Sequence, residues 1–271
     1  MRTTFIGGGN MASALVGGLL KRGWPASDLS VVELLPQARE SLARRFGVAV
    51  HAAVPDRLEA QDVIVLAIKP QHMLEAARTL RARLANQLVV SIAAGIRTDD
   101  LSRWLGGYEQ IVRVMPNTPA LVQAGISALF AMPAVTPDAR ARAERILAAV
   151  GATLWVDREE LMDAVTAVSG SGPAYVFYCM EAVMRAAEEL GLPPEQARTL
   201  TLETFFGAAS LARQSSETPA TLRVQVTSKG GTTERALNAL DAAAVKQHLV
   251  DAVKQAAERS RELGEQLSRA D

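Results

Sequence analysis

Short apolar runs alternate with longer amphipathic segments in the first half of the chain, and this alternation predicts an α/β fold. Short apolar runs bounded by turn residues are typical of buried parallel strands. Apolar residues three and four positions apart are typical of helices that cover a sheet. The pattern therefore predicts a doubly wound, mostly parallel sheet. The predicted strands are residues 3–7, 29–33, 48–51, 62–68, 88–93, 110–114, 125–131 and 152–156, and the predicted covering helices are residues 10–22, 35–46, 71–84 and 138–150.

The second half of the chain has a different pattern, which predicts a domain built only of helices. After Asp157 the short apolar runs stop, and long stretches rich in Ala, Leu, Glu and Arg follow. Prolines that open these stretches and glycines that close them mark helix ends. Helices are expected from Gly172 to Gly191, from Pro194 to Gln214, from Pro219 to the loop at 228–233, and from Ala242 to Leu267. We therefore expect two domains, residues 1–157 and residues 158–271.

Composition narrows the classes of protein to which the chain can belong. Hydrophobic residues make up 49% of the 271 residues, which is enough for a sizeable core. The 29 Lys and Arg residues balance the 29 Asp and Glu residues, and this balance disfavours a nucleic-acid partner. No apolar run approaches the roughly 20 residues of a membrane helix, and the run at the start is too short for an export signal. We expect a cytoplasmic protein with no membrane partner.

Residues that commonly perform acid–base or metal chemistry are scarce. The single cysteine, Cys179, cannot form a disulfide within the chain, and the three histidines are far apart in sequence. No Cys or His pair has the spacing of a zinc site, so we expect no metal centre. Only five of the 29 basic residues are lysines. The chain therefore offers few candidates for a catalytic side chain.

The first predicted strand leads into a glycine-rich fingerprint that is typical of a dinucleotide-binding Rossmann domain. Gly7, Gly9 and Ala12 occupy the three small positions of G-x-G-x-x-A. Gly7 permits a tight turn, Gly9 lets the backbone approach a diphosphate, and Ala12 lets the following helix pack closely on the strand. The N-terminus of that helix then faces the phosphates with free N–H groups. A glycine-rich turn without a ligand is the alternative.

Glu33 ends the second predicted strand, where an acidic residue would accept hydrogen bonds from the hydroxyls of the adenosine ribose. A carboxylate at this position repels a 2′-phosphate and favours NADH over NADPH. In the alternative, Glu33 points to solvent and Arg39 or another cation accepts the phosphate.

Two further strands end in residues that suit a cofactor. Lys69 follows the fourth predicted strand, at the sheet edge where ligands bind in doubly wound folds, although it also fits an ordinary surface cation. Ala93, Ala94 and Gly95 follow the fifth strand, and their small side chains would let a nicotinamide ring approach the backbone. They also fit a tight turn between a strand and a helix.

Six blocks together resemble the pyrroline-5-carboxylate reductases over residues 3 to about 265. They are Gly7-Gly8-Gly9-Asn10-Met11-Ala12, Ala67-Ile68-Lys69-Pro70, Ser91-Ile92-Ala93-Ala94-Gly95, Val114-Met115-Pro116-Asn117-Thr118-Pro119, residues 164–175 and Thr227-Ser228-Lys229-Gly230-Gly231-Thr232-Thr233. The resemblance implies reduction of 1-pyrroline-5-carboxylate to L-proline with NADPH or NADH, the last step of proline biosynthesis. It also implies a homodimer formed by the helical domain, with possible larger assemblies. The implied cofactor-binding residues are Ile6, Gly7, Gly8, Gly9, Asn10, Met11, Glu33, Ile68, Lys69, Pro70, Ala93, Ala94, Gly95 and Asn117.

The substrate is a cyclic imine with a carboxylate, and the last block offers groups that suit it. Backbone N–H groups at residues 230–233, just before an apolar helical run, form a suitable carboxylate cradle, although Thr232 and Thr233 also fit helix caps. The resemblance implies that Ser228, Gly230, Gly231, Thr232 and Thr233 bind substrate. It places Thr233 beside the imine nitrogen as the catalytic residue and Glu159 at the ring amine, although Glu159 alone also fits a solvated charge. Many relatives have Pro where this chain has Lys229.

Two other functions remain as alternatives at this point. A β-hydroxyacid dehydrogenase shares the two-domain plan, but its catalytic lysine has no counterpart because no lysine lies between Lys69 and Lys229. A non-catalytic NAD(P)-binding sensor would keep the fingerprint without turnover, yet Thr233 and the glycines before it are intact. An iminium accepts hydride without a strong general acid, so the scarcity of His and Lys favours the reductase.

Overall fold

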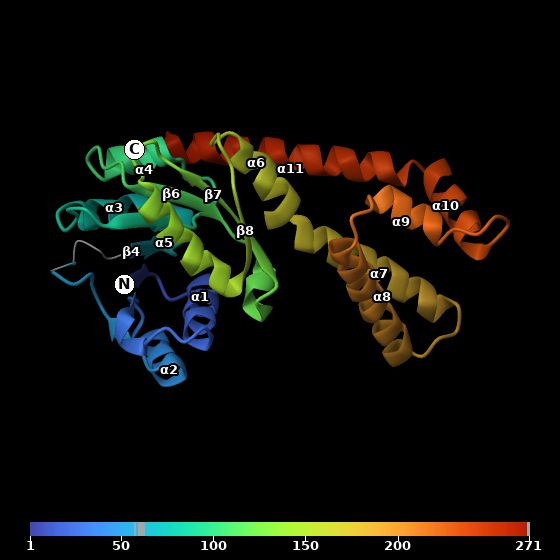
Figure 1. Ribbon diagram of the computed structural model, residues 1–271, viewed down its shortest axis with the longest axis horizontal. Helices are drawn as coiled ribbons and strands as arrows, with labels where there is room; N and C mark the ends of the chain where they lie inside the picture. The colour runs from blue at the N-terminus through green and yellow to red at the C-terminus, as the bar shows by residue number, and fades with distance from the viewer. Residues whose placement is uncertain (57, 59–62, 270–271) are drawn as a thin grey trace. The chain divides into compact units, whose positions relative to one another are not determined.

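Eight strands form one mostly parallel sheet in the computed structural model, which describes residues 1–56, 58 and 63–269 (Figure 1). Their order is β3-β2-β1-β4-β5-β6-β7-β8, and neighbours are parallel except β6 and β7. All eight predicted strands are confirmed. Residue 62 of the fourth predicted strand and residues 270–271 of the second predicted domain lie outside the described ranges. The strands are β1 (Thr3–Ile6), β2 (Leu29–Val32), β3 (Ala49–His51), β4 (Val63–Leu66), β5 (Leu88–Ser91), β6 (Ile111–Met115), β7 (Gly125–Ala131) and β8 (Gly151–Trp155).

Helices cover both faces of this sheet, as the doubly wound pattern predicts. The four predicted helices are confirmed as α1 (Asn10–Lys21), α2 (Pro36–Phe46), α3 (Met73–Arg81) and α5 (Pro137–Leu147). The structure adds α4 (Thr98–Trp104), whose seven residues are too few for a clear periodic pattern. Short 3₁₀ turns complete the connections at η1 (Ala26–Asp28), η2 (Pro70–His72), η3 (Thr118–Val122) and η4 (Ala148–Val150).

Successive residues of each central strand point to opposite faces and join two separate cores. Phe5 belongs to the core beneath α1 and α5, whereas the next residue, Ile6, belongs to the core beneath α3 and α4. All four residues of β1, β4 and β5 are buried. Strands buried on both faces need no alternation of polar and apolar residues, which explains the wholly apolar sequence of β4, Val-Ile-Val-Leu.

Helix α1 packs closely against the segment before β8 through a small residue. A Cβ atom added to Gly18 would lie 2.6 Å from the backbone oxygen of Ala149. The neighbouring Gly17 faces a side chain, since its Cβ would lie 3.2 Å from Cε1 of Phe46. The absence of a side chain at Gly18 therefore sets how closely α1 lies on the core.

The chain after β8 is helical throughout its described part, as predicted. Its elements are α6 (Leu161–Val165), the π-type turn η5 (Thr166–Gly170), α7 (Gly172–Glu189), α8 (Pro194–Gln214), α9 (Pro219–Gln225), α10 (Thr232–Ala242) and α11 (Val245–Ser268). The chain divides into two compact units. The first contains Met1–Ser171 and the chain from Ala256 onward, and the second contains Gly172–Gln255.

The end of α11 belongs to the first unit because residues of this helix form hydrogen bonds and apolar contacts with it. Ser260 donates a hydrogen bond to Asp163 of α6 over 2.7 Å, and Ser268 donates one to Asp100 of α4 over 2.7 Å. Leu267 packs on the core beneath α3 and α4. The predicted boundary near Asp157 marks the end of the strands. The first compact unit extends further, to Ser171, and it also includes α11 from Ala256 onward.

The Gly18→Ala substitution is expected to destabilise the protein by about 1–3 kcal/mol, because its new methyl group meets a backbone carbonyl that cannot rotate away. Gly17→Ala is the matched control on the same helix, where the Phe46 ring can move. Urea unfolding at one protein concentration measures both variants. Equal effects of the two substitutions would contradict this packing.

Candidate active site

The central strands end at one edge of the sheet and bring four loops together there. Ile6 pairs with Val32 on one side and with Leu66 on the other, and Leu66 pairs with Ser91. The loops after β1, β2, β4 and β5 therefore begin at the same level. This edge, where the strand order reverses about β1, is the ligand-binding position of doubly wound folds.

The loop after β1 forms a cradle of backbone atoms. Gly7 has φ +98°, and a Cβ atom there would lie 2.5 Å from the oxygen of Ala67 and 2.7 Å from Cγ2 of Ile68. By contrast, no described atom lies within 4 Å of the Cβ position of Gly9. The first position therefore requires glycine for the turn, and the second leaves open space above the loop.

The N-terminus of α1 lies in this cradle with its N–H groups available. Gly9 is the N-cap, no described side chain caps the helix, and the first turn from Asn10 contains no acidic residue. A helix N-terminus carries a partial positive charge and binds anions such as phosphate. The open space at Gly9 and these uncapped groups fit the diphosphate of a dinucleotide.

Glu33 lies beside the cradle and turns back toward it. Its Oε2 accepts a hydrogen bond from the N–H of Gly8 over 3.0 Å, and its Oε1 accepts one from the N–H of Leu35 over 2.9 Å. Arg39 donates from Nη1 to the carbonyl oxygens of Glu33, over 3.0 Å, and Leu34, over 2.7 Å. The structure thus brings both the expected carboxylate and the alternative cation to the loop after β2.

The loops after β4 and β5 differ in exposure. Lys69 is exposed at the start of η2, between Ile68 and Pro70. After β5, Ala93 is buried, Ala94 is exposed, and Gly95 is buried with φ +80°. Ala94 is therefore the one residue of Ala93–Gly95 whose side chain is exposed.

A side-chain hydrogen bond connects Asn117 to η5 within the first unit. Asn117 accepts a hydrogen bond from the N–H of Ile126 over 2.9 Å and donates one to the carbonyl of Ser169 over 3.2 Å. Gly170 packs against the end of the Met115 side chain so closely that a Cβ atom would overlap it. Turns of π type occur often at functional sites. The Asn117 side chain thus links Ile126 to η5, and its predicted contact with the cofactor stays a prediction.

Glu159 has partners that the sequence did not indicate. Its Oε1 accepts hydrogen bonds from the N–H of Thr98 and from Nη1 of Arg113, each over 2.8 Å, and its Oε2 accepts one from Oγ1 of Thr98 over 2.5 Å. The Arg113 side chain is only 7% exposed and that of Glu159 16%. A single arginine inside the apolar strand Ile111–Met115 was the available signal for this buried pair. The contact of Glu159 with the ring amine stays a prediction.

The second unit contains the predicted substrate loop. Gly230 has φ +74°, the N–H of Gly231 donates to the Ser228 carbonyl over 3.1 Å, and the N–H of Gly230 donates to Glu234 over 2.7 Å. Helix α10 begins at Thr232 with Gly231 as its N-cap, and no described side chain caps it. The alternative of Thr232 and Thr233 as helix caps therefore finds no support. Lys229 is exposed.

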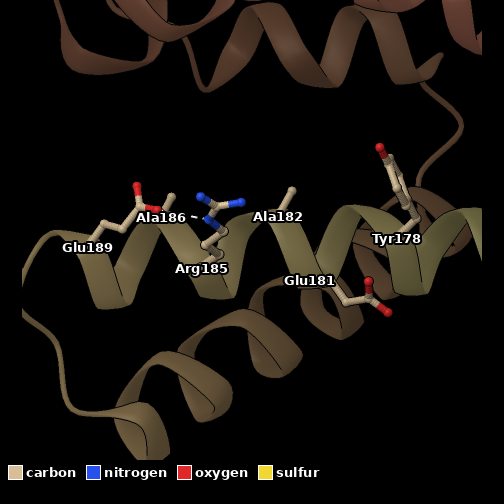
Figure 2. Close-up of a pocket in the computed structure, with 6 residues that line it drawn as sticks. All are labelled: Tyr178, Glu181, Ala182, Arg185, Ala186 and Glu189. Carbon is tan, nitrogen blue, oxygen red and sulfur yellow. Dashed lines mark hydrogen bonds and ion pairs between the residues drawn. The ribbon is translucent and has the colours of Figure 1, made fainter.

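A separate hollow of about 370 Å³ lies along α7 (Figure 2). All of its lining residues come from that one helix. Figure 2 shows the ion pair between Arg185 and Glu189, in which Nε of Arg185 lies 2.8 Å from Oε1 of Glu189. None of the predicted cofactor or substrate residues lines it. The lining residues are Tyr178, Glu181, Ala182, Arg185, Ala186 and Glu189.

The described part of the chain contains neither a metal-binding cluster nor a membrane-spanning helix. No three His, Cys, Asp or Glu side chains there gather as a metal site would require. No helix there is long and apolar enough to cross a membrane.

Comparisons with known proteins find similarity to pyrroline-5-carboxylate reductases over nearly the whole chain. Residues 159–263 match the family model for pyrroline-5-carboxylate reductase dimerisation, and residues 2–95 match the model described as NADP oxidoreductase coenzyme F420-dependent. The pyrroline-5-carboxylate reductase of Pseudomonas aeruginosa is 45% identical over 98% of each chain.

Solved structures give the same result. A pyrroline-5-carboxylate reductase from Coxiella burnetii has a TM-score of 0.90 at 39% identity, covering 97% of this chain and 98% of that one. The Plasmodium falciparum pyrroline carboxylate reductase, solved with NADP bound, has a TM-score of 0.85 at 28% identity over 97% and 98% of the chains. This chain belongs to the pyrroline-5-carboxylate reductase family.

Proposed function

We infer that this chain, as a member of its family, reduces 1-pyrroline-5-carboxylate to L-proline. The reaction is the last step of proline biosynthesis and uses NAD(P)H. One structural observation carries the assignment of residues to this reaction. Helices α1 and α10, one in each compact unit, begin after a glycine N-cap and without a side-chain cap in the described structure. The two reactants carry a diphosphate and a carboxylate, the anions that such helix ends bind.

The first uncapped helix end supports a cofactor site at the cradle. Gly7, Gly8 and Gly9 would hold the diphosphate with the first N–H groups of α1, at Asn10 and Met11. Glu33 would accept hydrogen bonds from the adenosine ribose, beside Ile6. Further along the edge, the exposed side of the turn at Ala93–Gly95 would face the nicotinamide end. Ile68, Lys69, Pro70 and Asn117 complete the proposed cofactor-binding set.

The second uncapped helix end supports a substrate site. The N–H groups of Thr232 and Thr233 would bind the substrate carboxylate, because those of Gly230 and Gly231 already donate to Glu234 and to the Ser228 carbonyl. Gly230 and Gly231 would line the site, and Ser228 and the Thr232 hydroxyl would add donors. Thr233 would donate a hydrogen bond to the ring nitrogen of the neutral imine or relay a proton to it, which gives the iminium. Both carboxylate oxygens of Glu159 already accept hydrogen bonds within the first unit. Its contact with the ring amine of the substrate therefore stays a prediction.

The chemistry places modest demands on the protein. The substrate can arrive protonated at nitrogen, as an iminium whose carbon accepts hydride without help from a strong general acid. When bound, NAD(P)H supplies that hydride, and the C=N bond becomes the C–N bond of proline. Binding and orientation of the two reactants, and not acid–base chemistry, would then be the main source of acceleration for such a step.

A second copy of the chain is the proposed partner of the helical unit. In the described structure neither α7 nor α10 contains a buried residue, and Phe206 of α8 is 71% exposed. Apolar surface of this extent marks a protein interface. We propose a homodimer that covers these helices, including the hollow along α7. Assembly beyond the dimer, a cytoplasmic location and a domain boundary near Asp157 remain predictions.

Gly9→Ala tests the cradle. Its φ of −66° suits alanine, so the melting temperature is expected to stay unchanged. The methyl group fills the space for the diphosphate, and the Kd for NAD(P)H should rise about tenfold or more, equivalent to about 1.4 kcal/mol. Gly7→Ala, at φ +98°, should instead lower the melting temperature. Titration of NADH fluorescence measures the affinity, and an unchanged Kd in Gly9→Ala would refute the cradle.

Glu33→Ser tests the cofactor preference. Removing the carboxylate removes its repulsion of a 2′-phosphate, so kcat/KM should shift toward NADPH relative to NADH. Glu40→Ser, which removes the same charge from an exposed position on α2, is the control and should leave the ratio unchanged. If the NADPH-to-NADH ratio of kcat/KM in Glu33→Ser equals that of the wild type, the assignment of Glu33 is wrong.

Thr233→Ala tests the catalytic assignment. Loss of one hydrogen bond to the ring nitrogen should lower kcat/KM about tenfold, and Thr233→Ser should restore most of the activity. Steady-state rates with 1-pyrroline-5-carboxylate measure both variants. A decrease of less than about threefold in Thr233→Ala would remove the role proposed for this hydroxyl.

A further inference from the structure

The turn between β5 and α4, residues 92–97, is held by parts of the chain that lie far away in sequence. It contains Ala93–Gly95, the proposed contact with the nicotinamide end of the cofactor. Two anchors hold it, and both come from the chain after β8. All of these residues belong to the first compact unit.

Glu159 is the anchor at the far end of the turn. Its two carboxylate oxygens accept hydrogen bonds from the N–H and the hydroxyl of Thr98, the first residue of α4. Arg113 of β6 fixes the same carboxylate through an ion pair of 2.8 Å. Because the pair is largely buried, the carboxylate has few alternative partners and holds the start of α4 in one place.

The end of α11 is the anchor at the middle of the turn, and Figure 1 shows this end beside α4. A Cβ atom added to Gly264 would lie 3.2 Å from the carbonyl oxygen of Gly95, and a Cβ atom added to Gly95 would lie 3.0 Å from Cδ1 of Leu267. Ser268 donates a hydrogen bond to Asp100, which is 3.0 Å from Arg103. The helix therefore packs on the turn without space between them.

We propose that Glu159 and the last turns of α11 are positioning residues that clamp the β5–α4 turn for binding of the nicotinamide end of NAD(P)H. The proposal rests on the proposed function, in which this turn contacts the cofactor. A binding turn must be held within fractions of an ångström, so a loosened anchor should weaken cofactor binding more than substrate binding. Glu159 would then act on the cofactor through Thr98, and this role would replace its predicted contact with the ring amine.

Two serines of α11 provide a matched test. Ser268→Ala removes a hydrogen bond of 2.7 Å to Asp100, next to the turn, and Ser260→Ala removes one of 2.7 Å to Asp163 of α6, away from it. Ser268→Ala should raise the KM for NAD(P)H about three- to tenfold, with the KM for 1-pyrroline-5-carboxylate changed less than about twofold. Ser260→Ala should change neither KM. Equal effects of the two substitutions would show general docking of α11 and overturn the clamp.

Gly264→Ala and Glu159→Gln test the two anchors directly, with the same shift in the KM for NAD(P)H expected. A rise in the KM for 1-pyrroline-5-carboxylate in Glu159→Gln, with the KM for NAD(P)H unchanged, would make Glu159 a substrate contact and overturn its positioning role. If either variant fails to fold, the comparison of Ser268→Ala with Ser260→Ala decides whether the clamp exists.

Ala94→Leu separates this proposal from the proposed function. Its larger side chain should raise the KM for NAD(P)H if the exposed side of the turn contacts the cofactor. An unchanged KM would refute that contact, and the clamp with it. A raised KM in Ala94→Leu together with wild-type values in Ser268→Ala and Gly264→Ala would refute the clamp alone.

Discussion

The chain turns sharply at Gly7 because β1 ends between β2 and β4, and the proposed cofactor site depends on this turn. Three parallel strands in register end at one level, so the backbone leaving β1 passes directly against the carbonyl of Ala67. Only a residue without a side chain can occupy that position at φ +98°. The turn directs α1 so that its N-terminus lies open at the sheet edge. The contacts of Glu33 and Ile68 with the same loop follow from this placement.

The scarcity of acid–base side chains agrees with the chemistry. Reduction of an iminium needs a hydride donor and a site for a carboxylate, and backbone N–H groups at α1 and α10 are the proposed anion sites. Such groups have a fixed orientation and do not titrate, so they need no tuning by burial. The protein contributes binding and orientation, and the cofactor contributes the chemical reagent.

The sequence predicted the strands well because each is a short apolar run between turn residues, and the sheet buries these runs on both faces. It also predicted helices, from apolar periodicity for α1 and from the opening proline for α8. It did not predict α4, which is too short for a periodic pattern, or the return of α11 to the first unit. That return depends on single polar contacts such as Ser268 with Asp100, which leave no periodic signal.

The candidate site was predictable to a similar degree. Glycines with special backbone roles, such as Gly7, can be recognised from their spacing. The partners of Glu159 could not be recognised, because Thr98 and Arg113 are 61 and 46 residues away in the chain and no local pattern links them.

The most direct test of the account is a crystal structure of the wild-type protein with NADPH and L-proline bound. The account predicts the diphosphate on the N–H groups of Gly9 and Asn10, the nicotinamide end against Ala94, and the proline carboxylate on residues 230–233. A diphosphate bound away from the N-terminus of α1, or a proline carboxylate bound away from the N-terminus of α10, would contradict it.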